Sequence, residues 1–486
     1  MSKQKSLKVN FIMNALLTMS SFLFPLITFP YVSRVLLPVG TGRVSFANSV
    51  VTYFVMLSQL GIPTYGIRAC AVVRDNKNKL KETVYELFII NIIMSVLAYI
   101  VFFITLFTIP RLRSDKILFL ITSSLIFFNT IGVEWLYKAL EQYTYIAVRS
   151  IIFKFIALLA MFVLVHDEND YIIYGAISIF AASASNVFNF IRLRKIIGRG
   201  KIKKLNLRKH LRPVLTFFII SCATTIYTNL DNVMLGFIKD DIEVGYYNAA
   251  TKIKNILVSV VTSLGTVLLP RASYYVECEM WDEFYRLSRK AIKFVLLIGT
   301  SMMVYFMMFA REGVLFLSGE AFEGAVIPMI IVMPTLLFIG LTNIMGIQML
   351  IPIRRENAVM ISTFVGAIVD LMLNFIFIPK LGSAGAAIGT LVAEFVVLIV
   401  QLIYLRKDIK YLYSKQKYMI IIIALLISLG GAFIIKRIDM GIFVKLVCSC
   451  IVFFSIYISA LYIMKEEFVC ENVNRVVNKL NKIKKR

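Results

Sequence analysis

The chain has 486 residues, of which 59% are hydrophobic and 17% charged, and its mean hydropathy is +0.81. This composition is too apolar for a soluble globular protein and indicates a polytopic membrane protein. The formal charge of +25 does not indicate nucleic-acid binding, because nearly all Lys and Arg residues lie between apolar segments, where they set membrane orientation. The six cysteines form no CxxC pair, so we expect neither a disulfide framework nor a metal site.

The apolar segments predict an all-α fold of about fourteen transmembrane helices, since a spanning helix needs about 20 apolar residues. The first segment lacks a cleavage site and is too long for a signal peptide, so we expect an uncleaved helix. Pro25 and Pro30 in the first segment, and Pro328 and Pro334 in the tenth, mark positions where a helix can bend. The predicted spans cover residues 9–36, 44–66, 83–109, 117–139, 146–165, 171–191, 211–237, 246–270, 290–310, 324–350, 358–378, 383–404, 418–435 and 441–463.

Alternate connections hold most of the 53 basic residues, which predicts that both termini are cytoplasmic. One basic turn, with Arg111 and Arg113, falls on the predicted outer side and is not explained by this rule. The densest basic connection follows the sixth span and divides the chain into two predicted six-helix lobes. The predicted parts are an N-terminal lobe (1–191), a basic cytoplasmic linker (192–210), a C-terminal lobe (211–405), and a final helix pair with a basic tail (406–486).

Ionisable side chains within apolar spans are candidate functional residues, because burying a charge in hydrocarbon is costly. Basic residues outnumber acidic ones there, so a cavity between the lobes would attract an anion. We expect Arg34 and Lys252 in the outer half of the membrane and Lys154 in the inner half. Asp231 and Asn229, on the seventh span, complete the predicted substrate site.

Three carboxylates in the spans are candidates for coupling to a proton or sodium ion: Asp370, Glu394 and Glu134. A structural hydrogen-bonding role remains open for the first two. Glu134 can instead pair with Lys138, one helical turn away. No other cofactor and no metal site is expected.

Three sequence motifs resemble the polysaccharide transporter family, the Wzx-type lipid-linked oligosaccharide flippases of the multidrug/oligosaccharidyl-lipid/polysaccharide exporter superfamily. These motifs are the run 30–48 (PYVSRVLLPVGTGRVSFAN), the stretch 134–141 (EWLYKALE) and the segment 229–247, which begins NLDNVMLG and ends GYY. The resemblance implies two six-helix lobes facing each other in a V, plus the C-terminal pair. It also implies that basic residues facing the lumen hold a diphosphate, at Arg34 by its motif and at Lys154 and Lys252 by position only.

The resemblance further implies a flippase that moves an undecaprenyl-diphosphate-linked oligosaccharide across the cytoplasmic membrane by alternating access. The product would be a surface polysaccharide such as capsule or O-antigen. Expected partners are the lipid-linked oligosaccharide, membrane lipid and other polysaccharide-assembly proteins, but no nucleic acid. Three alternatives remain: a cation-coupled multidrug or organic-ion antiporter of the same superfamily, a membrane polysaccharide-assembly enzyme, and a scaffold. The enzyme is disfavoured because both histidines, His166 and His210, fall at predicted loops.

Overall fold

The computed structural model describes residues 7–198, 205–412, 418–471 and 473–474. Throughout these residues the regular secondary structure is helical, which confirms the predicted all-α fold. The chain divides into two compact units, Met1–Gly245 and Tyr246–Arg486. These units are defined by packing, and their boundary differs from those of the predicted lobes, 1–191 and 211–405. The predicted lobe boundaries remain a prediction. Residues 199–204 of the predicted basic linker and 475–486 of the tail lie outside the described residues.

The described helices agree with the predicted number of membrane spans. Twelve are long and apolar enough to cross a membrane, or thirteen if the bent pair Glu320–Val332 and Thr335–Leu350 is one span. The first, Met19–Val73, has 55 residues, more than twice the length that a bilayer requires. Dividing this segment at its internal break yields the fourteen spans that the sequence predicts.

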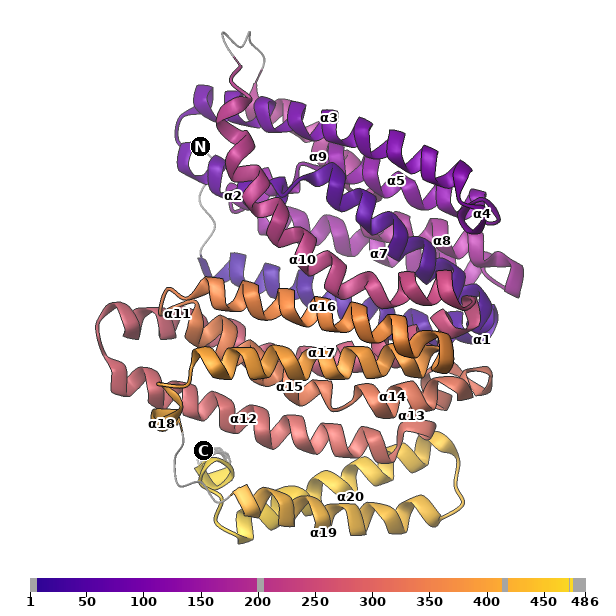
Figure 1. Ribbon diagram of the computed structural model, residues 1–486, viewed down its shortest axis with the longest axis vertical. Coiled ribbons are helices and arrows are strands. Elements are labelled where there is room, and N and C mark those ends of the chain that lie inside the picture. Colours follow the sequence, from indigo (N-terminus) through magenta and orange to yellow (C-terminus); the bar gives the residue numbers. More distant parts are fainter. Residues whose placement is uncertain (1–6, 199–204, 413–417, 472, 475–486) are drawn as a thin grey trace, which may run out of the picture. The chain divides into compact units, whose positions relative to one another are not determined.

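The first unit is built around the long helix α1, which packs against α3, α5, α7 and α10 (Figure 1). The helix α10, which corresponds to the seventh predicted span, therefore belongs to this unit. The helices of the unit are α1 (Leu7–Gln59), α2 (Ile62–Val73), α3 (Lys77–Thr108), α4 (Pro110–Arg113), α5 (Lys116–Gly132), α6 (Glu134–Ala139), α7 (Tyr143–Leu164), η1 (Glu168–Asp170), α8 (Tyr171–Ile179), η2 (Phe180–Ala184), α9 (Asn186–Ile197) and α10 (Arg208–Ile238), and α11 (Asp241–Glu277) begins here.

The break in α1 falls at Leu37, whose φ of 56° and ψ of −178° are not helical. Leu37 precedes Pro38, and a proline ring disfavours the helical conformation of the residue before it. Pro25 and Pro30 lie inside the helix, and the non-helical angles occur at Leu37, beyond both of them. The break therefore lies in the connection predicted between the first two spans, 9–36 and 44–66, and not at Pro25 or Pro30, where bending was expected.

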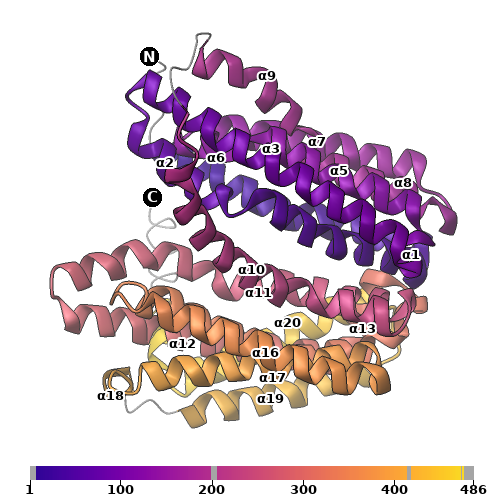
Figure 2. The same ribbon diagram turned by 45° about the horizontal axis from the view of Figure 1, so that its top comes forward.

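In its described residues the second unit contains α11 beyond Gly245 and nine further α-helices. Its centre is α17, which lies side by side with α16 and also packs against α14 and α15 (Figure 1, Figure 2). The last two helices, α19 and α20, pack against each other and against α12. The elements are α12 (Trp281–Met308), α13 (Ala310–Ser318), η3 (Glu320–Ala325), α14 (Val326–Val332), α15 (Thr335–Thr342), η4 (Asn343–Leu350), α16 (Glu356–Leu381), α17 (Ser383–Tyr404), α18 (Ile409–Leu412), α19 (Tyr418–Arg437) and α20 (Ile442–Ile463).

The tenth predicted span is broken as its prolines suggest. The helix pair is bent by 46°, and α15 begins directly after Pro334. The helix then widens into the π-helical segment η4, which contains Gly346. A second π-helical segment, η2, interrupts the span between α8 and α9 and was not predicted, because no proline marks it.

Candidate functional site

Arg34 lies on the first half of α1 and its side chain is exposed. The neighbouring Val32, Ser33 and Leu36 are fully buried, so the helix turns Arg34 away from the packed interior of the unit. One of its terminal nitrogens donates a hydrogen bond to the carbonyl oxygen of Pro30 at 2.5 Å. A guanidinium group is costly in hydrocarbon, and this exposed position therefore suits a side chain that faces a hydrated space.

Lys154 lies on α7 and is half-buried against the N-terminal part of α1. Its Nζ donates hydrogen bonds to the hydroxyl oxygens of Ser20 at 3.0 Å and Ser21 at 2.9 Å. Because an α-helix rises 1.5 Å per residue, Ser20 and Arg34 lie about 21 Å apart along α1. Arg34 and the Nζ atom of Lys154, which are the two predicted anion-binding groups of this unit, therefore lie at different depths along α1 and do not form one cluster.

Asp231 and Asn229 lie on α10. The Asp231 side chain is 7% exposed, while Asn229 is half-buried and donates to the carbonyl oxygen of Thr225 at 3.1 Å and the hydroxyl of Thr228 at 3.0 Å. Only 6% of the most apolar stretch of α10 is buried. The other residues of this stretch are half-buried or exposed, and they include hydroxyl and amide side chains.

Glu134 begins α6 and forms ion pairs with two basic residues of the same unit. Its carboxylate oxygens lie 2.8 Å from Lys138 Nζ and 3.7 Å from a terminal nitrogen of Arg149. Arg149 is buried and is also within hydrogen-bond distance of Asn186, at 3.3 Å. The intrahelical pair that the sequence allowed is therefore present, and a coupling role for Glu134 stays a prediction.

The second unit holds Lys252, Asp370 and Glu394. Lys252 lies on α11 and is half-buried. On α16 the side chain of Asp370 is 1% exposed, and on α17 that of Glu394 is 8% exposed. A Cβ atom on Gly389 of α17 would lie 3.0 Å from Asp370 Oδ1 and 2.4 Å from Asn374 Oδ1. The glycine thus lets α17 approach the polar side chains of α16 closely, and both carboxylates lie within the packed interior of the unit.

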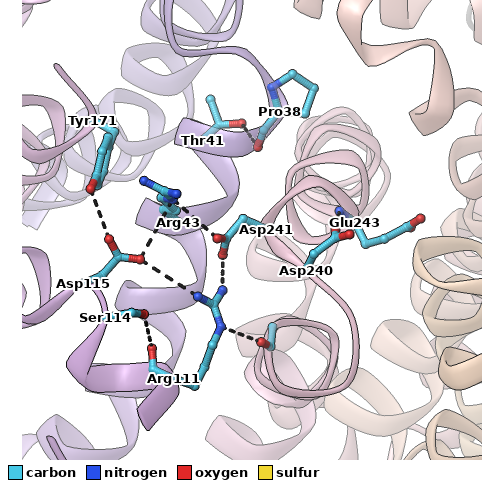
Figure 3. Close-up of polar contacts among 11 residues, drawn as sticks. Pro38, Thr41, Arg43, Arg111, Ser114, Asp115, Tyr171, Asp240, Asp241 and Glu243 are labelled. Atoms are coloured by element: carbon cyan, nitrogen blue, oxygen red, sulfur yellow. Dashed lines mark hydrogen bonds and ion pairs between the residues drawn. The ribbon is translucent and has the colours of Figure 1, made fainter. Parts of the chain in front are cut away.

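A cluster of charged residues at one end of the first unit was not predicted. Arg43, Arg111, Asp115 and Asp241, which we call the turn cluster, come from α1, α4, the start of α5 and the start of α11 (Figure 3). Arg111 is paired with Asp241, and its Nε donates to the carbonyl oxygen of Gly236 at 3.0 Å. Arg43 Nε lies 3.4 Å from Asp241 and 3.9 Å from Asp115.

The turn cluster joins both sides of the α10–α11 turn to the rest of the unit. Gly236 lies in the last turn of α10, where carbonyl groups have no partner within the helix, so Arg111 caps this terminus. Asp241 lies in the first turn of α11, where a negative charge is favourable. The cluster accounts for the basic turn at Arg111 that membrane orientation did not explain. The one signal for it in the sequence was the i,i+4 spacing of Arg111 and Asp115.

Two glycines allow the backbones of α1 and α11 to touch beside the turn cluster. A Cβ atom on Gly42 would lie 1.7 Å from the carbonyl oxygen of Asp241, and one on Gly245 would lie 2.2 Å from that of Pro38. Distances this short are excluded for any residue with a side chain. Gly42 of α1 and Gly245 of α11 are thus each in contact with the other's helix.

At its other end the first unit contains a buried hydrogen-bonded chain centred on Glu86. The carboxylate of Glu86 lies 2.9 Å from His210 Nε2 and 2.7 Å from Lys209 Nζ. The other ring nitrogen of His210 lies 2.8 Å from the hydroxyl of Tyr65. The sequence placed His210 in a loop, but it lies in the first turn of α10 and is 3% exposed. Because both of its ring nitrogens are engaged, His210 is poorly placed to act as a general base.

The fold defined by these units is that of membrane exporters and flippases. The structure titled "Lipid II flippase MurJ, inward closed conformation" superposes with a TM-score of 0.75 at 16% identity, over 94% of this chain and all of that one. An inward-facing multidrug resistance transporter of the MATE family, in the MOP superfamily, superposes with a TM-score of 0.61 at 16% identity, over 83% of this chain and 98% of that one.

Sequence comparison identifies the family. A protein of Escherichia coli (strain K12) that is proposed to be an O-antigen transporter is 26% identical over 410 residues, which cover 83% of this chain and 97% of that protein. The family model described as polysaccharide biosynthesis protein matches residues 7–276, and the MatE model matches residues 217–376. The chain belongs to the polysaccharide biosynthesis protein family, and its predicted place in the exporter superfamily is confirmed.

Proposed function

We propose that the protein is a flippase that moves an undecaprenyl-diphosphate-linked oligosaccharide repeat unit from the inner to the outer leaflet of the cytoplasmic membrane. The product would be a surface polysaccharide such as capsule or O-antigen. The observation that carries this proposal is the alignment with nearly the whole length of a proposed O-antigen transporter. The lipid-linked substrate and other polysaccharide-assembly proteins are the proposed partners. The distribution of basic residues supports a cytoplasmic position for both termini.

In this proposal Arg34 is the principal contact of the diphosphate. A guanidinium group can form two parallel charge-assisted hydrogen bonds to phosphate oxygens, whereas Lys154 and Lys252 would act as point charges. Support comes from the exposure of Arg34 within an apolar stretch of α1. Asp231 and Asn229 offer a carboxylate and an amide oxygen that can accept hydrogen bonds from sugar hydroxyl groups, since the amide nitrogen of Asn229 already donates to Thr225 and Thr228.

Transport would proceed by alternating access, with Asp370 and Glu394 binding a coupling proton or sodium ion. A carboxylate in a low-dielectric interior gains most from a bound cation, and these two are 1% and 8% exposed. Glu134 is the weaker candidate, because its carboxylate already has two basic partners. No enzymatic step is proposed.

The test is deletion of the gene followed by tracking of lipid-linked oligosaccharide. We expect the deletion strain to accumulate this lipid in the cytoplasmic leaflet, and wild-type protein to restore its export. Arg34→Ala should fail to restore export, Arg34→Lys should restore it in part, and Arg437→Ala should restore it fully. Arg437 is a matched control because it is also an exposed arginine on an apolar helix, in the last turn of α19. Normal export with Arg34→Ala at equal membrane levels would contradict the site assignment.

A cation-coupled multidrug or organic-ion antiporter is the second candidate, favoured by the match of residues 217–376 to the MatE model. The same strains distinguish the two functions. Loss of cationic-dye efflux on deletion, with unchanged distribution of lipid-linked oligosaccharide, would support the antiporter and refute the flippase.

A further inference from the structure

The second unit contains a basic pocket of ≈ 210 Å³ that the proposed transport function does not use. It lies between the first turns of α12 and the segment that follows α20. A pocket needs only about 10–15 Å³ to hold one water molecule, so this one can admit a group as large as a phosphate with part of its hydration. Its lining residues are Arg286, Arg289, Lys290, Lys293, Glu467, Phe468 and Glu471.

The four basic residues of the pocket lie on one face of α12. Their spacing of three, four and seven residues is that of neighbours on a helix surface. The lining contains four cations and two carboxylates, and Arg286 also pairs with Glu283, just outside the pocket, at 3.0 Å. Lys293 is already paired with Glu466 at 2.5 Å, and Lys290 lies 3.6 Å from Glu471. Arg289 has no ion pair or hydrogen bond recorded within the described residues, so its guanidinium is available to a ligand.

The pocket lies where α12 changes from charged to apolar. Directly after Lys293, the ring of Phe294 lies 6.3 Å from that of Phe468. Phe468 also packs against the hydrophobic cluster of Leu297 and Leu461. This arrangement places the basic groups at the edge of the apolar layer, at the level of lipid phosphate groups. Basic pockets beside transmembrane helices are known sites for anionic lipid head groups.

We propose that this pocket binds the phosphate group of an anionic membrane phospholipid, with Arg289 as the main contact and Lys290 as the second. The ligand is a lipid rather than a soluble phosphate because the ring of Phe468 and the apolar surface next to it continue the site toward the bilayer. Bound lipid would stabilise the packing of the segment after α20 on α12. This inference is independent of the substrate that the protein transports.

The test uses the full-length protein in nanodiscs and measures its thermal unfolding. Nanodiscs that contain phosphatidylglycerol should give a higher melting temperature than nanodiscs of phosphatidylcholine alone. The double variant Arg289→Gln, Lys290→Gln should lose this stabilisation, whereas Arg437→Gln should keep it. In titrations with short-chain phosphatidylglycerol in detergent, the double variant should bind about tenfold more weakly, as expected for loss of a charge-assisted hydrogen bond.

Three outcomes would overturn the proposal. One is equal stabilisation of the wild type and the double variant by phosphatidylglycerol. Another is equal stabilisation by inorganic phosphate and by the lipid, which would assign the pocket to a soluble anion. The third is a double variant that melts well below the wild type in phosphatidylcholine alone, because Arg289 would then be part of the packed structure. The variant Arg289→Lys keeps the positive charge, and it should melt normally and retain part of the lipid response.

Discussion

Replacing Gly42 with alanine tests whether α1 and α11 touch through their backbones. The added Cβ atom would lie 1.7 Å from the carbonyl oxygen of Asp241, 2.7 Å from its carbonyl carbon and 3.0 Å from the nitrogen of Gly245. These are backbone atoms and cannot rotate away, so the start of α11 must move. Overpacking usually costs about 1–3 kcal/mol, and a clash with backbone falls at or above the upper end of that range.

The cost can be measured as a change in melting temperature. One kcal/mol shifts the melting temperature of a domain of this size by about 2–4 °C, so about 3 kcal/mol corresponds to a decrease of about 6–12 °C. The assay is thermal unfolding of the purified protein in detergent, followed by helical circular dichroism. Gly430→Ala is the control, because among the described residues no atom outside its own stretch of helix lies within 4 Å of the Cβ position there. If Gly42→Ala melts at the temperature of the wild type, the close approach of α1 and α11 does not exist.

Three further substitutions separate binding, coupling and folding. Lys154→Met removes two interhelical hydrogen bonds worth about 0.6 kcal/mol each, so we expect only a small decrease in melting temperature. Transport should nevertheless be at least about tenfold slower, because a charged contact of the substrate is lost. A normal transport rate would exclude Lys154 from the site. Asp370→Asn should leave the amount of folded protein unchanged but abolish the response of transport to a proton or sodium gradient. The response is measured in vesicles with and without that gradient. An intact response would exclude Asp370 from coupling. Glu86→Ala removes the acceptor shared by Lys209 and His210. Because leaving buried polar groups unsatisfied costs about 1–3 kcal/mol, the melting temperature should fall by several degrees. An unchanged melting temperature would mean that water replaces the carboxylate.

The sequence predicted the features that depend on composition along the chain. Apolar segment lengths were sufficient for the all-α fold and the approximate number of spans, because the bilayer itself sets the length of a helix. The bend at Pro334 was also predicted from a local feature of the sequence, because proline lacks the backbone N–H group that a continuous helix needs. The break at Leu37 falls between the first two predicted spans, 9–36 and 44–66, so the lengths of the apolar segments were sufficient to predict it, whereas the bends expected at Pro25 and Pro30 have no counterpart in the backbone angles.

The features that depend on packing between distant segments were not predicted. Arg111 looked like an exception to the orientation rule because its partner, Asp241, lies 130 positions away in the sequence. His210 looked like a loop residue because charged residues surround it, yet Glu86 and Tyr65 hold it within the first unit. In both cases a polar residue is stabilised by a partner from another helix, which no local pattern indicates.

The most direct test of the proposed flippase is transport by the purified protein in vesicles. A lipid-linked diphosphate oligosaccharide is placed in the inner leaflet, and its appearance in the outer leaflet is measured with an enzyme or lectin that cannot enter the vesicle. We predict that the wild type and Arg437→Ala move the lipid, and that Arg34→Ala moves it at the rate of protein-free vesicles. Equal rates for the wild type and Arg34→Ala, or no transport by the wild type above the protein-free rate, would contradict the proposal that Arg34 holds the diphosphate of a transported lipid.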